Sequence, residues 1–206
     1  MIKAIVFDYG GVIKINDSDL IADICEYLNI NKEDWLKEYF QINDLDSTQN
    51  VSFEDVFKMV TLKFNDEEEA QNHVLELMKS HKGKYHLNNE LIDTIKEFRN
   101  KGYKTALLSN NSIELRQRLI DDGIIDIFDE VIISAEVGLQ KPQPGIFDIL
   151  FKKLELKPDE VVFVDDTLRS LEGADSIGYI PILFKDNESL KLELSNILEG
   201  KRILKI

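Results

Sequence analysis

Two groups of acidic side chains each follow a short apolar run that is typical of a buried strand. Residues 2–7 are mainly apolar and lead into Asp8, and residues 161–164 lead into Asp165 and Asp166. Strands buried on both faces belong to parallel sheets, and such sheets bind ligands at the carboxyl ends of their strands. Three carboxylates that meet there could bind a divalent metal ion, and one could act as a nucleophile.

Two more polar segments stand at similar places in the sequence. Ser109 and Asn110 follow the apolar run 103–108, and Lys141 precedes a helical pattern. Each segment alone has a structural explanation, because Ser109 could cap the next helix, Lys141 could be a solvated surface charge, and Asp8 could begin a turn. Their joint order along the chain favours a functional site.

The spacing of apolar residues predicts the elements that must position these side chains. From about residue 91 onward, helical and strand patterns alternate, which is typical of repeated βα units. The predicted strands are 2–7, 103–108, 131–133, 161–164 and 179–184, and the predicted helices are 91–100, 113–122, 146–154 and 171–177, with a weak helical pattern over 189–206. We therefore predict an α/β fold with a doubly wound, mostly parallel sheet.

A helical insertion is predicted between the first strand and the rest of this core. No comparable strand pattern occurs before residue 91, and the apolar spacing is helical instead. The predicted helices of the insertion are 19–28, 32–40, 52–64 and 66–80. We predict a core domain of residues 1–14 and 84–206 and a helical domain of residues 15–83.

Composition narrows the possible partners. The chain has 206 residues, is 43% hydrophobic and carries a formal net charge of -14. Such a charge argues against nucleic acid or an anionic membrane as a partner, because both would be repelled. No apolar run is long enough for a signal peptide or a membrane span, so a cytoplasmic protein is expected. We expect a small-molecule partner and a monomer or homodimer.

The strand-end motifs together resemble those of the haloacid dehalogenase-like (HAD) hydrolase superfamily. The matching segments are Phe7-Asp8-Tyr9-Gly10-Gly11-Val12, Leu108-Ser109-Asn110, Lys141-Pro142-Gln143-Pro144 and Val164-Asp165-Asp166. The resemblance covers the whole core. Glu172-Gly173-Ala174 and the helical insertion are also similar to the subgroup with a C1-type cap. This likeness implies a Rossmann-like core with an inserted α-helical cap.

The resemblance also implies a reaction and a set of roles. A Mg²⁺-dependent phosphatase would hydrolyse a small phosphorylated metabolite, with sugar phosphates as one candidate class, through an aspartyl-phosphate intermediate. Asp8 would be the nucleophile, and Lys141 would be the second catalytic residue. The implied metal ligands are Asp8, the backbone carbonyl of Gly10, Asp165 and Asp166, and the implied phosphate-binding residues are Ser109, Asn110 and Lys141.

One position departs from the phosphatases of this superfamily. They usually carry a second Asp two residues after the nucleophile as general acid and base, whereas this chain has Gly10. General acid–base catalysis typically contributes about 10²–10⁴-fold in rate, so ordinary alkoxide leaving groups should react slowly. The chain resembles superfamily branches that lack this Asp, which include sugar phosphatases. His73, His81 and His86, in or beside the insertion, are candidate proton donors.

Two other functions fit the sequence. A 2-haloacid dehalogenase-type hydrolase also lacks the second Asp, but it has no need of a metal ion and has fewer carboxylates in its site. A catalytically weakened member could instead bind a phosphorylated ligand or a partner protein without turnover. The pair Asp165 and Asp166 favours phosphate chemistry, and the retained Asp8, Ser109 and Lys141 favour an active enzyme.

Overall fold

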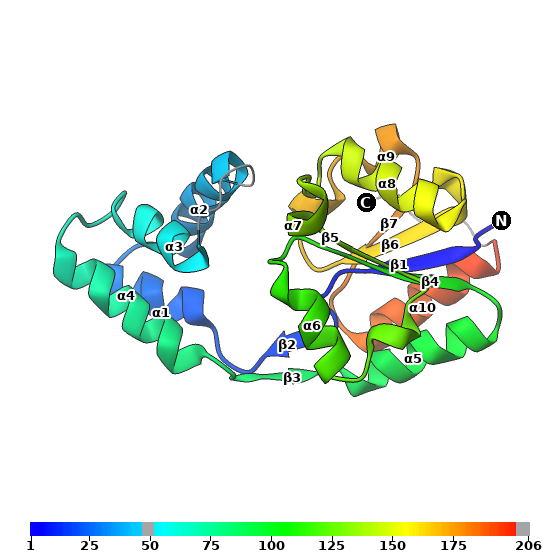
Figure 1. Ribbon diagram of the computed structural model, residues 1–206, viewed down its shortest axis with the longest axis horizontal. Helices are drawn as coiled ribbons and strands as arrows, with labels where there is room; N and C mark the ends of the chain where they lie inside the picture. Colours follow the sequence, from blue (N-terminus) through cyan, green and yellow to red (C-terminus); the bar gives the residue numbers. More distant parts are fainter. Residues whose placement is uncertain (47–51, 201–206) are drawn as a thin grey trace. The chain divides into compact units, whose positions relative to one another are not determined.

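The computed structural model describes residues 1–46 and 52–200 of the chain, so positions 201–206 of the predicted tail helix lie outside the described residues. The chain forms two compact units, one of Met1–Ile15 with Leu87–Ile206 and one of Asn16–His86 (Figure 1). Over the described ranges, no helix has both the length and the apolar character that crossing a membrane requires.

A five-stranded parallel sheet forms the centre of the first unit. Its strand order is β5-β4-β1-β6-β7, and the strands are β1 (Ala4–Phe7), β4 (Lys104–Ser109), β5 (Glu130–Ile133), β6 (Val161–Asp165) and β7 (Ile180–Leu183). Phe7 of the central strand pairs with Leu107 on one side and Val164 on the other. The carboxyl ends of β1, β4 and β6 therefore meet at one edge, and the predicted doubly wound α/β fold is confirmed.

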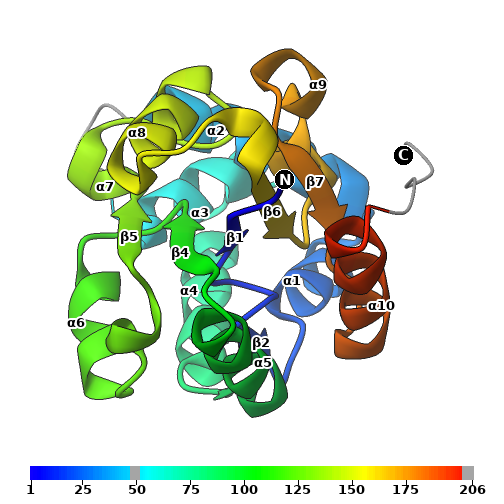
Figure 2. The same cartoon turned by 90° about the vertical axis from the view of Figure 1, so that its right-hand side faces the viewer.

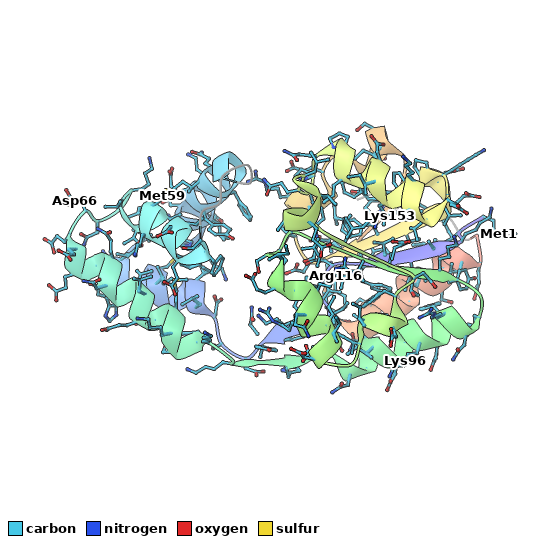
Figure 3. The ribbon with its side chains drawn as sticks, in the orientation of Figure 1. Met1, Met59, Asp66, Lys96, Arg116 and Lys153 are labelled. Atoms are coloured by element: carbon cyan, nitrogen blue, oxygen red, sulfur yellow. The ribbon has the colours of Figure 1, made fainter. Side chains whose placement is uncertain are left out.

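Helices cover both faces of the sheet because side chains along each strand alternate between two apolar clusters. Helices α5 (Asn89–Asn100), α6 (Glu114–Asp121) and α10 (Asn187–Leu198) pack on the face that carries Ile5 and Phe7. Helices α8 (Pro144–Leu154) and α9 (Ala174–Ile177) pack on the face that carries Ala4 and Val6 (Figure 2). Exposed charges such as Lys96 lie on the outer side of the helices (Figure 3).

The helix predicted over 171–177 was wrong in its extent. The segment instead forms a 3₁₀ turn, η3 (Leu168–Leu171), and the short helix α9. Gly173 lies between them with a φ of +80°. A left-handed residue ends regular helical hydrogen bonding, so this glycine divides the segment. Three further short elements, which the apolar pattern did not predict, are α7 (Ser134–Val137), η1 (Ile125–Ile127) and η2 (Pro158–Glu160).

The second unit is helical. Its helices are α1 (Leu20–Leu28), α2 (Lys32–Asp46), α3 (Phe53–Thr61) and α4 (Glu68–His81). Ile24, Trp35, Phe57 and Val74 belong to one buried cluster, which is separate from the two clusters of the sheet. Trp35 and Phe57 are thus part of the core of this unit.

A two-stranded ribbon carries the chain between the two units. Its strands are β2 (Lys14–Asn16) and β3 (Tyr85–Leu87), which pair with each other. The backbone N–H of Asp17 donates to the carbonyl of Lys84 at 2.9 Å, and the Asp17 carboxylate contacts Nδ1 of His86 at 2.5 Å. The sequence pattern gave no strand here, because each strand has only three residues and is partly exposed.

Candidate active site

Three of the predicted site residues are in direct contact at the carboxyl edge of the sheet. The ammonium nitrogen of Lys141 lies 2.8 Å from Oδ1 of Asp8 and 2.6 Å from Oδ2 of Asp165. Asp8 directly follows β1, and Asp165 is the last residue of the adjacent strand β6. The Asp8 backbone N–H donates to the carbonyl of Val164 at 2.9 Å, so backbone pairing between these strands continues to Asp8.

Burial strengthens the electrostatics of this cluster. Lys141 is 5% exposed, Asp8 7% and Asp165 1%. Burial alone would lower the pKa of Lys141, but the neighbouring charges of Asp8 and Asp165 outweigh it and raise that pKa, so the ammonium form is favoured. Burial and the charge of Asp8 raise the pKa of Asp165, although Lys141 opposes this shift. A buried charge is stable only when it is paired with an opposite charge, and Lys141 is the shared partner of Asp8 and Asp165.

Asp166 adds a third carboxylate to the cluster. One carboxylate oxygen from each of Asp8, Asp165 and Asp166 lies within 4.8 Å of the other two. Asp166 is the most exposed of the three, yet desolvation of its carboxyl group and the charges of Asp8 and Asp165 raise its pKa to about 6. Thr167 orients both acids, because its N–H donates to Oδ1 of Asp165 at 2.9 Å and its hydroxyl to Oδ1 of Asp166 at 3.3 Å.

The turn after Asp8 depends on its two glycines in different ways. Gly11 has a φ of +72°, and a Cβ at that position would lie 2.1 Å from a carboxylate oxygen of Asp166. Only glycine allows this backbone conformation and this approach without moving the acid. At Gly10, in contrast, a Cβ would meet nothing closer than Oδ2 of Asp8, at 4.0 Å. The position that lacks the expected second Asp thus has room for a side chain.

Ser109 and Asn110 lie at the end of the strand next to β1. Ser109 is the last residue of β4 and is 2% exposed, whereas Asn110 is exposed. The carboxamide of Asn110 contacts the backbone of Lys141, with its Nδ2 donating to the Lys141 carbonyl at 3.0 Å and its Oδ1 accepting from the Lys141 N–H at 2.8 Å. The sequence predicted the position of Asn110 beside the cluster but not this contact.

Two further contributions to the site were not predicted. Phe163 lies two residues before Asp165 on β6, and its ring centroid is 5.1 Å from the Lys141 nitrogen, a cation–π distance. Thr167 orients Asp165 and Asp166, as described above. An Asp side chain commonly accepts a hydrogen bond from the backbone N–H two residues later, so the contact between Thr167 and Asp165 could have been found from the sequence. Phe163 could not, because an aromatic residue in a buried strand is usually only part of the core.

The three histidines considered as proton donors have other partners. Nδ1 of His81 is 2.7 Å from the Ser18 hydroxyl, and its Nε2 is 2.8 Å from Asp23. His86 contacts Asp17, and His73 stacks on Tyr27 with ring centroids 4.0 Å apart. All of these pairs lie within the second unit, which gives each histidine a structural role there.

The carboxylate cluster fits a divalent cation. With all groups ionised, Asp8, Asp165 and Asp166 contribute three negative charges and Lys141 one positive charge, so two negative charges remain uncompensated. Oxygen ligands are what Mg²⁺ prefers, and a divalent ion would neutralise the excess. The raised pKa of Asp166 arises first from desolvation of its carboxyl group and then from this excess of negative charge.

Comparison with known proteins identifies the family of this chain. Residues 2–178 match the model of the haloacid dehalogenase-like hydrolase family. A glyceraldehyde 3-phosphate phosphatase of Methanopyrus kandleri is 33% identical over 109 residues, which cover 52% of this chain and 47% of that protein. The chain spans about half the length, or less, of the first curated relatives that it matches.

Solved structures resemble the whole chain. A HAD phosphatase from Thermococcus onnurineus superposes with a TM-score of 0.62 at 25% identity, covering 98% of this chain and all of that one. A HAD family enzyme from Bacteroides thetaiotaomicron, solved with magnesium and inorganic phosphate, has a TM-score of 0.61 at 20% identity over 92% of this chain and 99% of that one. With the family match over residues 2–178, these findings place the chain in the haloacid dehalogenase-like hydrolase family.

Proposed function

We propose that this protein is a Mg²⁺-dependent phosphatase that acts on a small phosphorylated metabolite, with sugar phosphates as the first class to test. The observation that carries the proposal is the buried contact of Lys141 with both Asp8 and Asp165, together with the third carboxylate of Asp166. Relatives named as glyceraldehyde 3-phosphate phosphatases support a small phosphorylated substrate.

The reaction begins at Asp8. Lys141 binds its Oδ1, and we assign Oδ2 as the oxygen that attacks phosphorus. The new Oδ2–P bond forms as the bond from phosphorus to the leaving oxygen breaks, and the dephosphorylated part of the substrate departs as an alkoxide that takes a proton from water. Water then attacks the phosphorus of the aspartyl phosphate, which releases inorganic phosphate and restores the carboxylate.

The other residues oppose the repulsion between an anionic nucleophile and an anionic phosphate. Lys141 supplies positive charge beside Asp8, and Ser109 with the N–H of Asn110 would donate hydrogen bonds to phosphoryl oxygens. Asp8, the carbonyl of Gly10, Asp165 and Asp166 would hold Mg²⁺. When bound, Mg²⁺ supplies positive charge and helps to fix the phosphoryl group. The helical unit, residues 16–86, is proposed to act as a C1-type cap that restricts substrate size.

The carboxylate content favours this function over the alternatives. Two carboxylates besides Asp8, those of Asp165 and Asp166, suit a metal site, whereas a dehalogenase needs no metal ion. The close packing of Asp8, Lys141 and Asp165 favours catalysis over simple ligand binding, because buried ionisable groups with shifted pKa values cluster at catalytic sites.

The proposal is tested by measuring phosphate release from a panel of phosphorylated metabolites and one activated aryl phosphate. We expect release in Mg²⁺ and its loss in excess EDTA, with recovery when Mg²⁺ is restored. Halide release from 2-haloacids is measured in parallel. Release of halide, or phosphate release that EDTA does not affect, would contradict the proposal.

A second expected result concerns Gly10. The Gly10→Asp substitution should increase turnover of ordinary alkyl phosphates by up to about 10²–10⁴-fold, because an acid there could protonate the leaving oxygen. The Cβ has room, and it would lie 4.0 Å from Oδ2 of Asp8. The aryl phosphate should gain little, since its leaving group needs no proton. Gly10→Asn is the matched control. An equal gain in turnover for alkyl and aryl phosphates would contradict the hypothesis that the lack of a general acid at position 10 limits the rate.

A further inference from the structure

Lys141 is positioned by a segment that is not part of the sheet. It lies in the connection between α7 and α8, outside any helix or strand, yet its ammonium group must lie between Asp8 and Asp165. These contacts join residues 133 and 24 positions apart in the sequence. A side chain with four rotatable bonds keeps such a place only if its backbone is also held.

The carboxamide of Asn110 holds that backbone at two points. Its Nδ2 donates to the Lys141 carbonyl at 3.0 Å, and its Oδ1 accepts from the Lys141 N–H at 2.8 Å. The side chain thus satisfies both polar groups of the Lys141 main chain, much as a neighbouring strand would. Because Asn110 directly follows β4, the two bonds fasten the connection to the edge of the sheet.

We propose that Asn110 is a positioning residue whose carboxamide keeps the Lys141 ammonium group between Asp8 and Asp165. The catalytic consequence rests on the proposed phosphatase function, whereas the positioning itself does not. The residue type fits this role, because a carboxamide offers a donor and an acceptor side by side and a carboxylate offers only acceptors. This role is separate from any hydrogen bond that the Asn110 backbone gives to a phosphate.

Two hydrogen bonds also lie within the connection itself. The N–H of Gln140 donates to the side-chain Oε1 of Gln143 at 3.0 Å, and the N–H of Gln143 donates to the carbonyl of Gln140 at 2.8 Å. These bonds shape a tight turn around Lys141 but do not tie it to β4. The Asn110 side chain connects Lys141 to β4. Because Asn110 is exposed, its truncation removes these two hydrogen bonds without opening a cavity in the core.

Asn110→Ala is the central test variant, and Asn100→Ala is its matched control, since Asn100 is the exposed last residue of α5. With the aryl phosphate and Mg²⁺, we expect kcat of Asn110→Ala to fall about 10–100-fold, because small displacements of catalytic groups have effects of this size. Melting curves check that both variants are folded at the assay temperature. Unchanged kcat would overturn the proposal.

A double variant separates positioning from direct substrate contact. If the Asn110 carboxamide acts through Lys141, then adding Asn110→Ala to Lys141→Met should cause little further loss of kcat/KM. If the two losses multiply, the carboxamide acts on the substrate independently, and the proposal fails.

A readout that needs no turnover keeps the test independent of the proposed activity. The accessibility of Lys141 is measured with an amine-reactive reagent and peptide mass spectrometry in native protein, with Lys104, which bonds the Leu154 carbonyl, as an internal reference. We expect slow labelling of Lys141 in wild type and in Asn100→Ala, and at least severalfold faster labelling in Asn110→Ala. Asn110→Asp should also be faster, because it cannot donate to the Lys141 carbonyl. Equal labelling of Lys141 in all variants would overturn the proposal even if no phosphatase substrate is found.

Discussion

Replacing Asp8 by asparagine is expected to abolish phosphate release while the protein stays folded. The amide that replaces the carboxylate is nearly the same size, but it is not nucleophilic and cannot form the bond to phosphorus. Loss of a nucleophile typically costs on the order of 10⁴-fold or more in kcat. Lys141 keeps its 2.6 Å contact with Asp165, so the buried cation retains one partner. Steady-state phosphate release in Mg²⁺ measures the effect.

Asp121→Asn is the matched control, because Asp121 is exposed at the end of α6 and its Oδ1, which accepts from Gln117, is retained in asparagine. Rapid acid quench with a substrate radiolabelled in its phosphate group tests directly for phosphate bound covalently to the protein. Wild-type protein and the control should carry transient label, and Asp8→Asn should carry none. Turnover by Asp8→Asn close to that of wild type would mean that another group attacks phosphorus.

Replacing Lys141 by methionine is expected to cause the largest loss of stability. Methionine has a similar length but removes the ammonium group with its charge and its two hydrogen bonds, which leaves Asp8 and Asp165 buried with no cation between them. Breaking a buried ion pair by removing one partner typically costs about 3–5 kcal/mol in the free energy of unfolding. Urea denaturation at neutral pH in EDTA measures that free energy, and kcat/KM should fall as well.

Two comparisons test this explanation. Lys104→Met removes a partly buried lysine that bonds only a carbonyl among its described contacts, so its cost should be much smaller. Adding Asp8→Asn and Asp165→Asn to Lys141→Met removes the uncompensated charges and should recover most of the loss. Acidification should also narrow the difference from wild type, because burial raises the pKa of Asp165 and protonation then removes that uncompensated charge. If the triple variant is no more stable than Lys141→Met, the loss comes from packing instead.

The general fold could be predicted because its evidence is local and repeated. Apolar runs such as residues 161–164 and the helical spacing between them indicated every strand of the large sheet and most of its helices. Once the strands are parallel, their carboxyl ends must share an edge, which placed Asp8 and Asp165 together. The roles of these residues stay predictions until the variants are measured.

The missed features depend on contacts that leave no local pattern. The carboxamide of Asn110 bonds a backbone 31 residues away, and a side chain bonding a distant main chain has no periodicity to detect. The close approach of Gly11 to Asp166 arises from two segments more than 150 residues apart, so only the folded chain reveals it. Strands β2 and β3 were missed because three residues are too few for a strand pattern.

The paired strands β2 and β3 also bear on how such a protein can evolve. The chain leaves the core after Ile15 and returns at Leu87, and the two passages run side by side. The free-energy cost of joining the ends of an inserted segment depends only weakly on its length. For a flexible loop, this cost rises by about 0.6 kcal/mol for each doubling of the length. Inserts of very different size could therefore be exchanged at this junction while β1 and β4 keep their register. The core and its insertion could then diverge as separate modules, one by drift in sequence and the other by wholesale replacement.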